Sequence, residues 1–211
     1  KNIAQLAIST NPKYTQLGLQ TTFRLVANDT MQAKAIGSFS GSKFTATKYA
    51  VLDDSTPYGK DLAAGATKEL LAAKKEIALK LSFDDKTREF DDLAVKIKDA
   101  GVEVIVTTLS DFQNIALLNG LKKINYTKIN LLGGDTIKTT DMLKGAGIVD
   151  GLYSTSPILD AREFPTGKAF LDKYLAAYKV APAYAGHYTY DATYVLAAAI
   201  RRTESANPEE I

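Results

Sequence analysis

A regular alternation of short apolar runs with amphipathic segments constrains the fold more than any other feature. Five apolar runs begin roughly 25 residues apart, and they predict strands near 48–53, 76–82, 102–108, 128–133 and 150–155. The segments between them repeat apolar residues at helical spacing, as Phe90, Leu93 and Ile97 do. This alternation predicts right-handed βαβ units and a parallel sheet covered by helices on both faces, an α/β fold.

The two ends of the chain differ from its middle. Residues 3–8 and 20–27 each predict an extended segment, and a long helical stretch follows Pro165 to about Arg202, with a break near Pro182. Helices of the middle region are expected at about 59–74, 87–100, 111–123 and 137–146. Because the sequence does not begin with Met and a strand-like run starts almost at its first residue, we interpret it as a trimmed fragment.

The composition excludes several classes of function. The chain has 211 residues, of which 45% are hydrophobic and 24% charged, as in a globular protein with a real core. Its 26 Lys and Arg residues are spread among 24 Asp and Glu residues, so no basic stripe indicates nucleic acid as a partner. No apolar run is long enough to span a membrane, and the absence of cysteine excludes disulfides, thiol nucleophiles and zinc–thiolate sites.

Catalytic motifs find little support. The single histidine, His187, stands among tyrosines on a predicted helix, without a second histidine for a metal site, so we expect a structural or surface role. The stretch Gly37–Gly41 superficially suggests a nucleophile elbow, but it lacks the G-x-S-x-G pattern and precedes a strand, so we predict a loop. No glycine-rich phosphate loop occurs. We therefore expect no enzyme activity, no cofactor and no metal.

Polar residues follow the predicted strands where a parallel sheet places its ligands, just past the carboxyl ends. The hydroxyls of Ser9 and Thr10 can hold a carboxylate or an ammonium group, although a plain Asn-Pro turn explains them equally well. Tyr58 offers a ring with one polar tip as a wall for a small ligand. Residues Asp53–Ser55, just before it, can instead serve only to cap the next helix.

Two further strand ends carry acidic side chains. Ser110 and Asp111 follow the strand near 102–108, and either one can contact a ligand or cap the next helix. Asp135 follows two glycines that allow close approach of the backbone, and its carboxylate suits an ammonium group. Capping of the next helix is the alternative role for Asp135.

Taken in order, these stretches resemble the leucine/isoleucine/valine-binding proteins of bacterial ABC importers over essentially the whole chain. Each motif is weak alone, and the ordered set is specific. The motifs are Ser9-Thr10-Asn11-Pro12, Thr22-Phe23-Arg24, Asp53-x-x-x-x-Tyr58-Gly59-Lys60, Phe83-Asp84-Asp85-Lys86-Thr87-x-x-Phe90, Gly133-Gly134-Asp135 and Tyr188-x-Tyr190-Asp191-Ala192.

The resemblance implies a type I periplasmic binding fold, in which two α/β lobes joined by three crossing segments close around a ligand. It implies that Ser9 and Thr10 bind the backbone groups of an amino acid from the N-terminal lobe. It also implies that Tyr58 lines the ligand and that Asp135, where many relatives carry the longer Glu, pairs with the ammonium group.

The resemblance further implies which positions set the identity of the ligand. Ser110 and Asp111 stand where the family often has an aromatic residue, which favours a more polar or different ligand. Tyr184 approximately matches another aromatic residue of the pocket. The expected ligand is therefore a small amino acid-like molecule, without a closer assignment.

The resemblance also implies a domain division and a cellular setting. Residues 1–24 would be a remnant of the N-terminal lobe with the first crossover, residues 25–160 the C-terminal lobe, and residues 161–211 a helical crossover back towards the N-terminal lobe. The implied protein is periplasmic and delivers its ligand to the permease of an ABC transporter, without spanning the membrane itself or binding nucleic acid.

Two alternatives remain open at this point. The same pair of lobes serves as the ligand-sensing domain of receptors and regulators. A flavodoxin-like enzyme or receiver domain would need a flavin site or a phosphoacceptor acid, and Asp53 and Asp54 at a strand end faintly suggest one. The Tyr58-Gly59 context argues against that reading.

Overall fold

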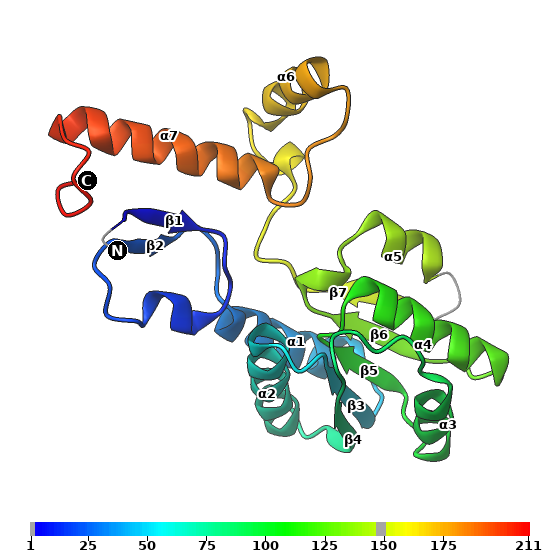
Figure 1. Ribbon diagram of the computed structural model, residues 1–211. Coiled ribbons are helices and arrows are strands. Elements are labelled where there is room, and N and C mark those ends of the chain that lie inside the picture. The colour runs from blue at the N-terminus through cyan, green and yellow to red at the C-terminus, as the bar shows by residue number, and fades with distance from the viewer. Residues whose placement is uncertain (1–2, 147–150) are drawn as a thin grey trace. The chain divides into compact units, whose positions relative to one another are not determined.

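The computed structural model describes residues 3–146 and 151–211, and Figure 1 shows its helices and strands. The chain forms two compact units. The sheet unit is Asp29–Ser156, and the terminal unit combines the residues up to Asn28 with Pro157–Ile211. The expected assignment of residues 1–24, 25–160 and 161–211 to lobes and crossovers stays a prediction.

Five parallel strands form the sheet unit, in the order β4-β3-β5-β6-β7. They are β3 (Lys48–Asp53), β4 (Glu76–Ser82), β5 (Val104–Thr107), β6 (Asn130–Gly133) and β7 (Gly151–Ser154). The predicted strands and the predicted parallel α/β sheet are confirmed, although residue 150 lies outside the described residues. Because β4 extends the sheet on one side of β3 and β5 to β7 extend it on the other, ligands are expected at the carboxyl ends of β3 and β5.

Helices cover both faces of this sheet (Figure 1). They are α1 (Asp29–Lys43), α2 (Pro57–Ala72), α3 (Asp91–Asp99), α4 (Asp111–Lys123) and the short α5 (Thr140–Gly145). Side chains of β3 alternate between the faces: Tyr49 and Val51 pack with α1 and α2, whereas Ala50 and Leu52 pack with α3 and α4. Burial on both faces explains why the strands read as continuous apolar runs.

The prediction of a loop at Gly37–Gly41 is wrong, because this stretch lies within α1. A Cβ atom on Gly37 would lie 2.5 Å from the Cβ of Glu69 in α2, so the glycine lets the two helices approach closely. The buried side of α1 also includes the polar residues Gln32 and Ser40. A helix that buries glycine and polar residues lacks the apolar periodicity by which the other helices are recognised.

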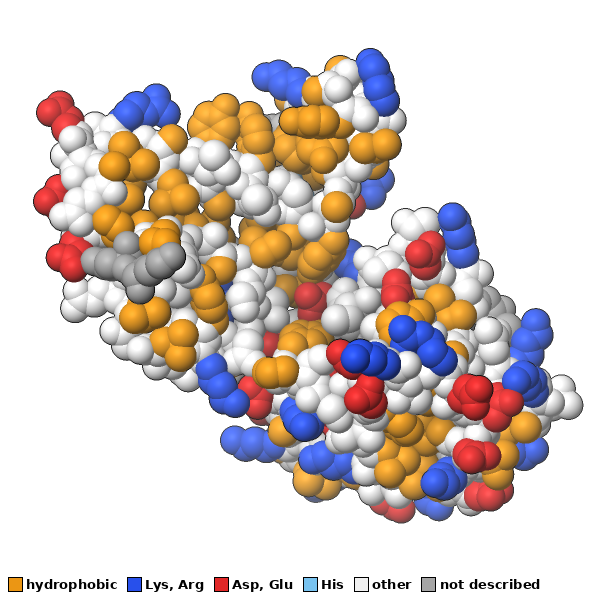
Figure 2. All heavy atoms as spheres, in the orientation of Figure 1, with side chains coloured by type: hydrophobic (Ala, Val, Ile, Leu, Met, Phe, Trp, Pro, Cys, Tyr) orange, Lys and Arg blue, Asp and Glu red, His pale blue; other side chains and the backbone are white. Residues whose placement is uncertain are grey.

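The terminal unit contains a two-stranded parallel sheet and two longer helices. Its elements are β1 (Gln5–Ala7), the 3-10 helix η1 (Pro12–Thr15), β2 (Thr22–Arg24), η3 (Ala161–Glu163), α6 (Gly167–Tyr178) and α7 (Gly186–Thr203). The extended ends and the broken helical stretch are as predicted. Exposed apolar side chains flank β1 and lie on β2 and α7 (Figure 2). Within residues 3–146 and 151–211, no helix combines the length and the apolarity needed to cross a membrane.

Candidate ligand-binding site

The loop after β3 positions Tyr58 at the start of α2. The hydroxyl oxygen of Thr56 accepts a hydrogen bond from the backbone N–H of Gly59 at 2.9 Å and so caps the helix. Asp54 accepts the backbone N–H and the hydroxyl of Thr56, at 3.1 and 2.6 Å. The helix is therefore capped by Thr56 and not, as predicted, by a residue of Asp53–Ser55. Asp54 stabilises the turn that places Tyr58 in the first turn of the helix.

Tyr58 and Asp135 come together at the carboxyl edge of the sheet. The Tyr58 hydroxyl donates to Oδ1 of Asp135 at 2.7 Å. Burial, and after it the negative charge of Asp135, raise the pKa of the Tyr58 phenol, which therefore stays a neutral donor. A Cβ atom on Gly134 would lie 2.3 Å from the Tyr58 hydroxyl oxygen, so the close contact requires glycine there.

Asp135 does not cap a helix. It is the first residue of the 3-10 helix η2 (Asp135–Ile137), whose N-cap residue is Gly134, and no side chain caps this element. The structure therefore does not show the alternative role of Asp135 as a helix cap. Its half-buried carboxylate instead accepts hydrogen bonds from two other elements of the sheet unit.

Gln32 of α1 is the second donor to Asp135, and the sequence did not reveal it. Its Nε2 donates to Oδ1 of Asp135 at 3.0 Å and to Oδ1 of Asp29 at 2.9 Å. Its Oε1 accepts the hydroxyl of Thr155, just after β7, at 2.8 Å. The signal that could have found Gln32 is an Asp-x-x-Gln spacing at a helix start, which was hidden because α1 itself was not predicted.

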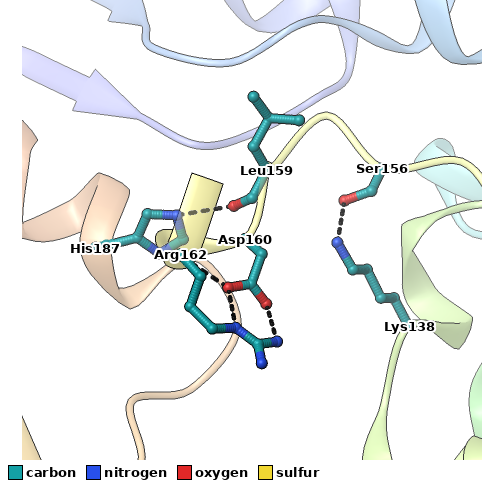
Figure 3. Close-up of polar contacts among 6 residues, drawn as sticks. All are labelled: Lys138, Ser156, Leu159, Asp160, Arg162 and His187. Carbon is teal, nitrogen blue, oxygen red and sulfur yellow. Dashed lines mark hydrogen bonds and ion pairs between the residues drawn. The ribbon is translucent and has the colours of Figure 1, made fainter. Parts of the chain in front are cut away.

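The charge of Asp135 meets only neutral donors. No Lys or Arg within the described residues forms an ion pair with it. Lys138 donates instead to the hydroxyl of Ser156 at 3.3 Å, as Figure 3 shows. A half-buried carboxylate whose protein partners are neutral can attract a cationic group, and the role of Asp135 in ligand binding stays a prediction.

Ser110 and Asp111 take part in the start of α4. The backbone N–H and the hydroxyl of Ser110 donate to Oε1 of Gln113 at 3.2 and 3.1 Å, and Asp111 accepts the hydroxyl of Thr139 at 2.9 Å. The Thr136 hydroxyl donates to the carbonyl oxygen of Leu109 at 3.1 Å, which ties this loop to the segment of Asp135. Contact of Ser110 and Asp111 with a ligand stays a prediction.

Ser9, Thr10 and Tyr184 belong to the terminal unit. Ser9 is exposed, Thr10 is buried, and both follow β1. Tyr184 is exposed in the turn before α7. Their roles in ligand binding stay predictions.

His187 also lies in the terminal unit, and its surroundings fit the expected structural role. Its Nε2 lies 2.9 Å from the carbonyl oxygen of Leu159, and Arg162 pairs nearby with Asp160 (Figure 3). The rings of Phe164 and Phe170 pack beside the imidazole. Among the residues that the structure describes, no group of three His, Cys, Asp or Glu side chains could hold a metal ion.

The sheet unit is a parallel α/β unit of three layers, and polar side chains gather at the carboxyl edge of its sheet, where α/β proteins of this class bind their ligands. The family model described as "Periplasmic binding protein" matches residues 4–211, and the chain belongs to this family. The predicted fold class and the resemblance to the branched-chain amino acid binding proteins are confirmed.

Individual relatives agree with this assignment. The chain is 31% identical to Leu/Ile/Val-binding protein homolog 1 of Brucella abortus (strain 2308), in an alignment that covers 96% of this chain and 54% of the relative. The leucine-binding protein of Thermotoga maritima MSB8 superposes with a TM-score of 0.84 at 20% identity, covering 97% of this chain and 59% of that one.

A third relative binds another kind of ligand. A solute-binding protein of an ABC transporter from R. palustris, in complex with 4-hydroxybenzoate, gives a TM-score of 0.78 at 19% identity, covering 96% of this chain and 56% of that one. This chain therefore spans about half the length of the relatives that it matches.

Proposed function

We propose that this chain is part of an extracytoplasmic solute-binding protein that captures a small amino acid for an ABC permease. The observation that supports it is the Asp135 carboxylate, which accepts hydrogen bonds from Tyr58 and Gln32 and forms no ion pair with the described Lys and Arg residues. An ammonium group supplies the positive charge that no described Lys or Arg brings to this carboxylate, together with further N–H donors.

The same carboxylate favours an amino acid over an aromatic acid. The relative from R. palustris was crystallised with 4-hydroxybenzoate, whose carboxylate carries the same charge as Asp135. Two negative groups brought together in a half-buried site repel each other, and no described cation pairs with Asp135 to offset this. The relative from Brucella abortus is named for leucine, isoleucine and valine, which all carry an ammonium group.

The proposal also assigns ligand contacts to residues of the terminal unit. Ser9 and Thr10 after β1 would bind the carboxylate of the amino acid, and Tyr184 would contact its side chain. Ligand binding would stabilise the ligand-bound shape of the protein, and we propose that the permease recognises this shape. The protein would act by binding alone, in the periplasm, and would perform no chemical step.

A calorimetric panel on the full-length protein tests the proposal. It consists of L-leucine, L-isoleucine, L-valine, L-threonine, L-alanine and 4-hydroxybenzoate. We expect micromolar or tighter binding of at least one amino acid and no measurable binding of 4-hydroxybenzoate. Binding of 4-hydroxybenzoate without any amino acid would overturn the assignment of the ligand.

A further inference from the structure

Both the N–H groups and the carbonyl oxygen of the Gln32 side chain form hydrogen bonds. The residue is only 3% exposed, and its two N–H groups point to two carboxylates, those of Asp29 and Asp135. Its carbonyl oxygen accepts the hydroxyl of Thr155. Thr155 is itself held by its backbone N–H, which donates to the carbonyl oxygen of Gly133 at 2.9 Å. Gln32 therefore links α1 to the ends of β6 and β7.

This arrangement fixes one oxygen of Asp135. Oδ1 accepts both the Tyr58 hydroxyl and Nε2 of Gln32, and no hydrogen bond from the described residues reaches Oδ2. Two donors on one oxygen hold the plane of the carboxylate and leave the other oxygen to accept from a ligand. Asp135 is half-buried, so solvent or a ligand can reach it.

A neutral amide suits this position better than a charged group. A Lys or Arg at residue 32 would pair with Asp135 and compete with a ligand cation, and an ionised Glu would repel both Asp29 and Asp135. Glutamine donates to the two carboxylates without cancelling the charge of Asp135, so it orients the acid and preserves its attraction for a cation.

We propose that Gln32 is a positioning residue for ligand binding. It acts through Asp135 by holding the carboxylate in the orientation that accepts the ammonium group, and it does not touch the ligand itself. This inference rests on the proposed function, because it needs a ligand that carries an ammonium group.

Two substitutions test it by calorimetry with L-leucine on the full-length protein. Gln32→Met removes the donor and keeps the side-chain length, and we expect affinity to fall about tenfold at every pH, which is the effect of one hydrogen bond to a charged group. Gln32→Glu keeps the shape and replaces the donor with an acceptor. We expect weaker binding than in Gln32→Met at neutral pH, with partial recovery as the pH falls towards about 5, where a protonated acid can donate.

Tyr126→Phe is the matched control. The Tyr126 hydroxyl donates to the carbonyl oxygen of Val102 at 2.8 Å, just before β5 and so at the opposite edge of the sheet. Its loss should lower the melting temperature without changing affinity. Circular dichroism at each pH shows that the variants remain folded, and the near-isosteric Gln32→Glu carries the test if Gln32→Met does not fold.

The outcomes separate the two claims. If the wild-type protein binds no amino acid, the proposed function falls and this inference falls with it. If the wild-type protein binds L-leucine and either variant binds as well as wild type, the positioning role alone is overturned. The same holds if Gln32→Glu shows no recovery at lower pH.

Discussion

The hydroxyl of Tyr58, in the first turn of α2, donates a 2.7 Å hydrogen bond to the carboxylate of Asp135, which follows β6. The contact joins two loops at the carboxyl edge of the sheet, on either side of the loop that follows β5. The negative charge of Asp135 therefore has a neutral donor beside it and not a cation, and the proposed function depends on this feature.

Tyr58→Phe removes this donor and keeps the ring. We expect amino acid binding by the full-length protein to weaken by about 0.5–1.5 kcal/mol, because Asp135 loses one of its two donors while its charge remains. Titration calorimetry measures the change. Equal weakening in Tyr126→Phe, at the other edge of the sheet, would show that the effect is general destabilisation.

The raised pKa of Tyr58 leads to a prediction of how the stability of the protein changes at alkaline pH. Burial and the charge of Asp135 raise the pKa of the phenol above its usual value in the folded state. Its contribution to stability is complete below the unfolded pKa of about 10, and it is lost as the pH rises further, because the unfolded state then releases the proton that the folded state keeps. Stability should therefore fall less steeply above that pH in Tyr58→Phe than in the wild type, as measured by urea unfolding. Equal slopes would contradict the raised pKa.

Two glycines of α1 give opposite predictions for the same change. A Cβ atom on Gly37 would meet the Cβ of Glu69 at 2.5 Å, so Gly37→Ala should destabilise the protein by about 1–3 kcal/mol through overpacking. On Gly41 the nearest neighbour, the Cβ of Ala73, would lie at 3.8 Å, so Gly41→Ala should stabilise the helix by about 0.5–1 kcal/mol. Thermal unfolding measures both changes. The same sign of effect at both positions would contradict the close packing of α1 on α2.

Gly134→Ala tests the contact between Tyr58 and the segment of Asp135. The added methyl group would overlap the Tyr58 hydroxyl oxygen, which must then move away from Asp135. We expect weaker amino acid binding with a loss at least as large as in Tyr58→Phe, because the displaced ring also disturbs the loop. Calorimetry on both variants decides the order, and wild-type affinity in Gly134→Ala would show that the contact is not needed.

Much of the sheet unit could be predicted from the sequence. The strands of a parallel sheet are buried on both faces, so they appear as unbroken apolar runs, and β3 and β4 begin and end where the pattern placed them. Helix α1 could not be predicted in this way. It buries Gln32, Gly37 and Ser40 against its neighbours, so its packing depends on small and polar residues that carry no apolar period.

The candidate site was predictable only in part. Tyr58 and Asp135 could be selected because each directly follows the end of a strand, where parallel sheets place polar groups. The contact of Gln32 with Asp135 joins residues far apart in the sequence, through a helix that the pattern did not reveal. The role of Ser110 could not be decided from the sequence, because the same pattern is typical of a helix cap and of a ligand contact. The structure shows Ser110 in the helix cap with Gln113.

Titration calorimetry of L-leucine binding to the full-length protein and to its Asp135→Asn variant tests the central claim most directly. The substitution keeps the size of the side chain and removes the charge that would meet the ammonium group. We predict that binding weakens by about 2–5 kcal/mol while the melting temperature shows that the variant stays folded. Unchanged affinity in a folded Asp135→Asn variant would contradict the account.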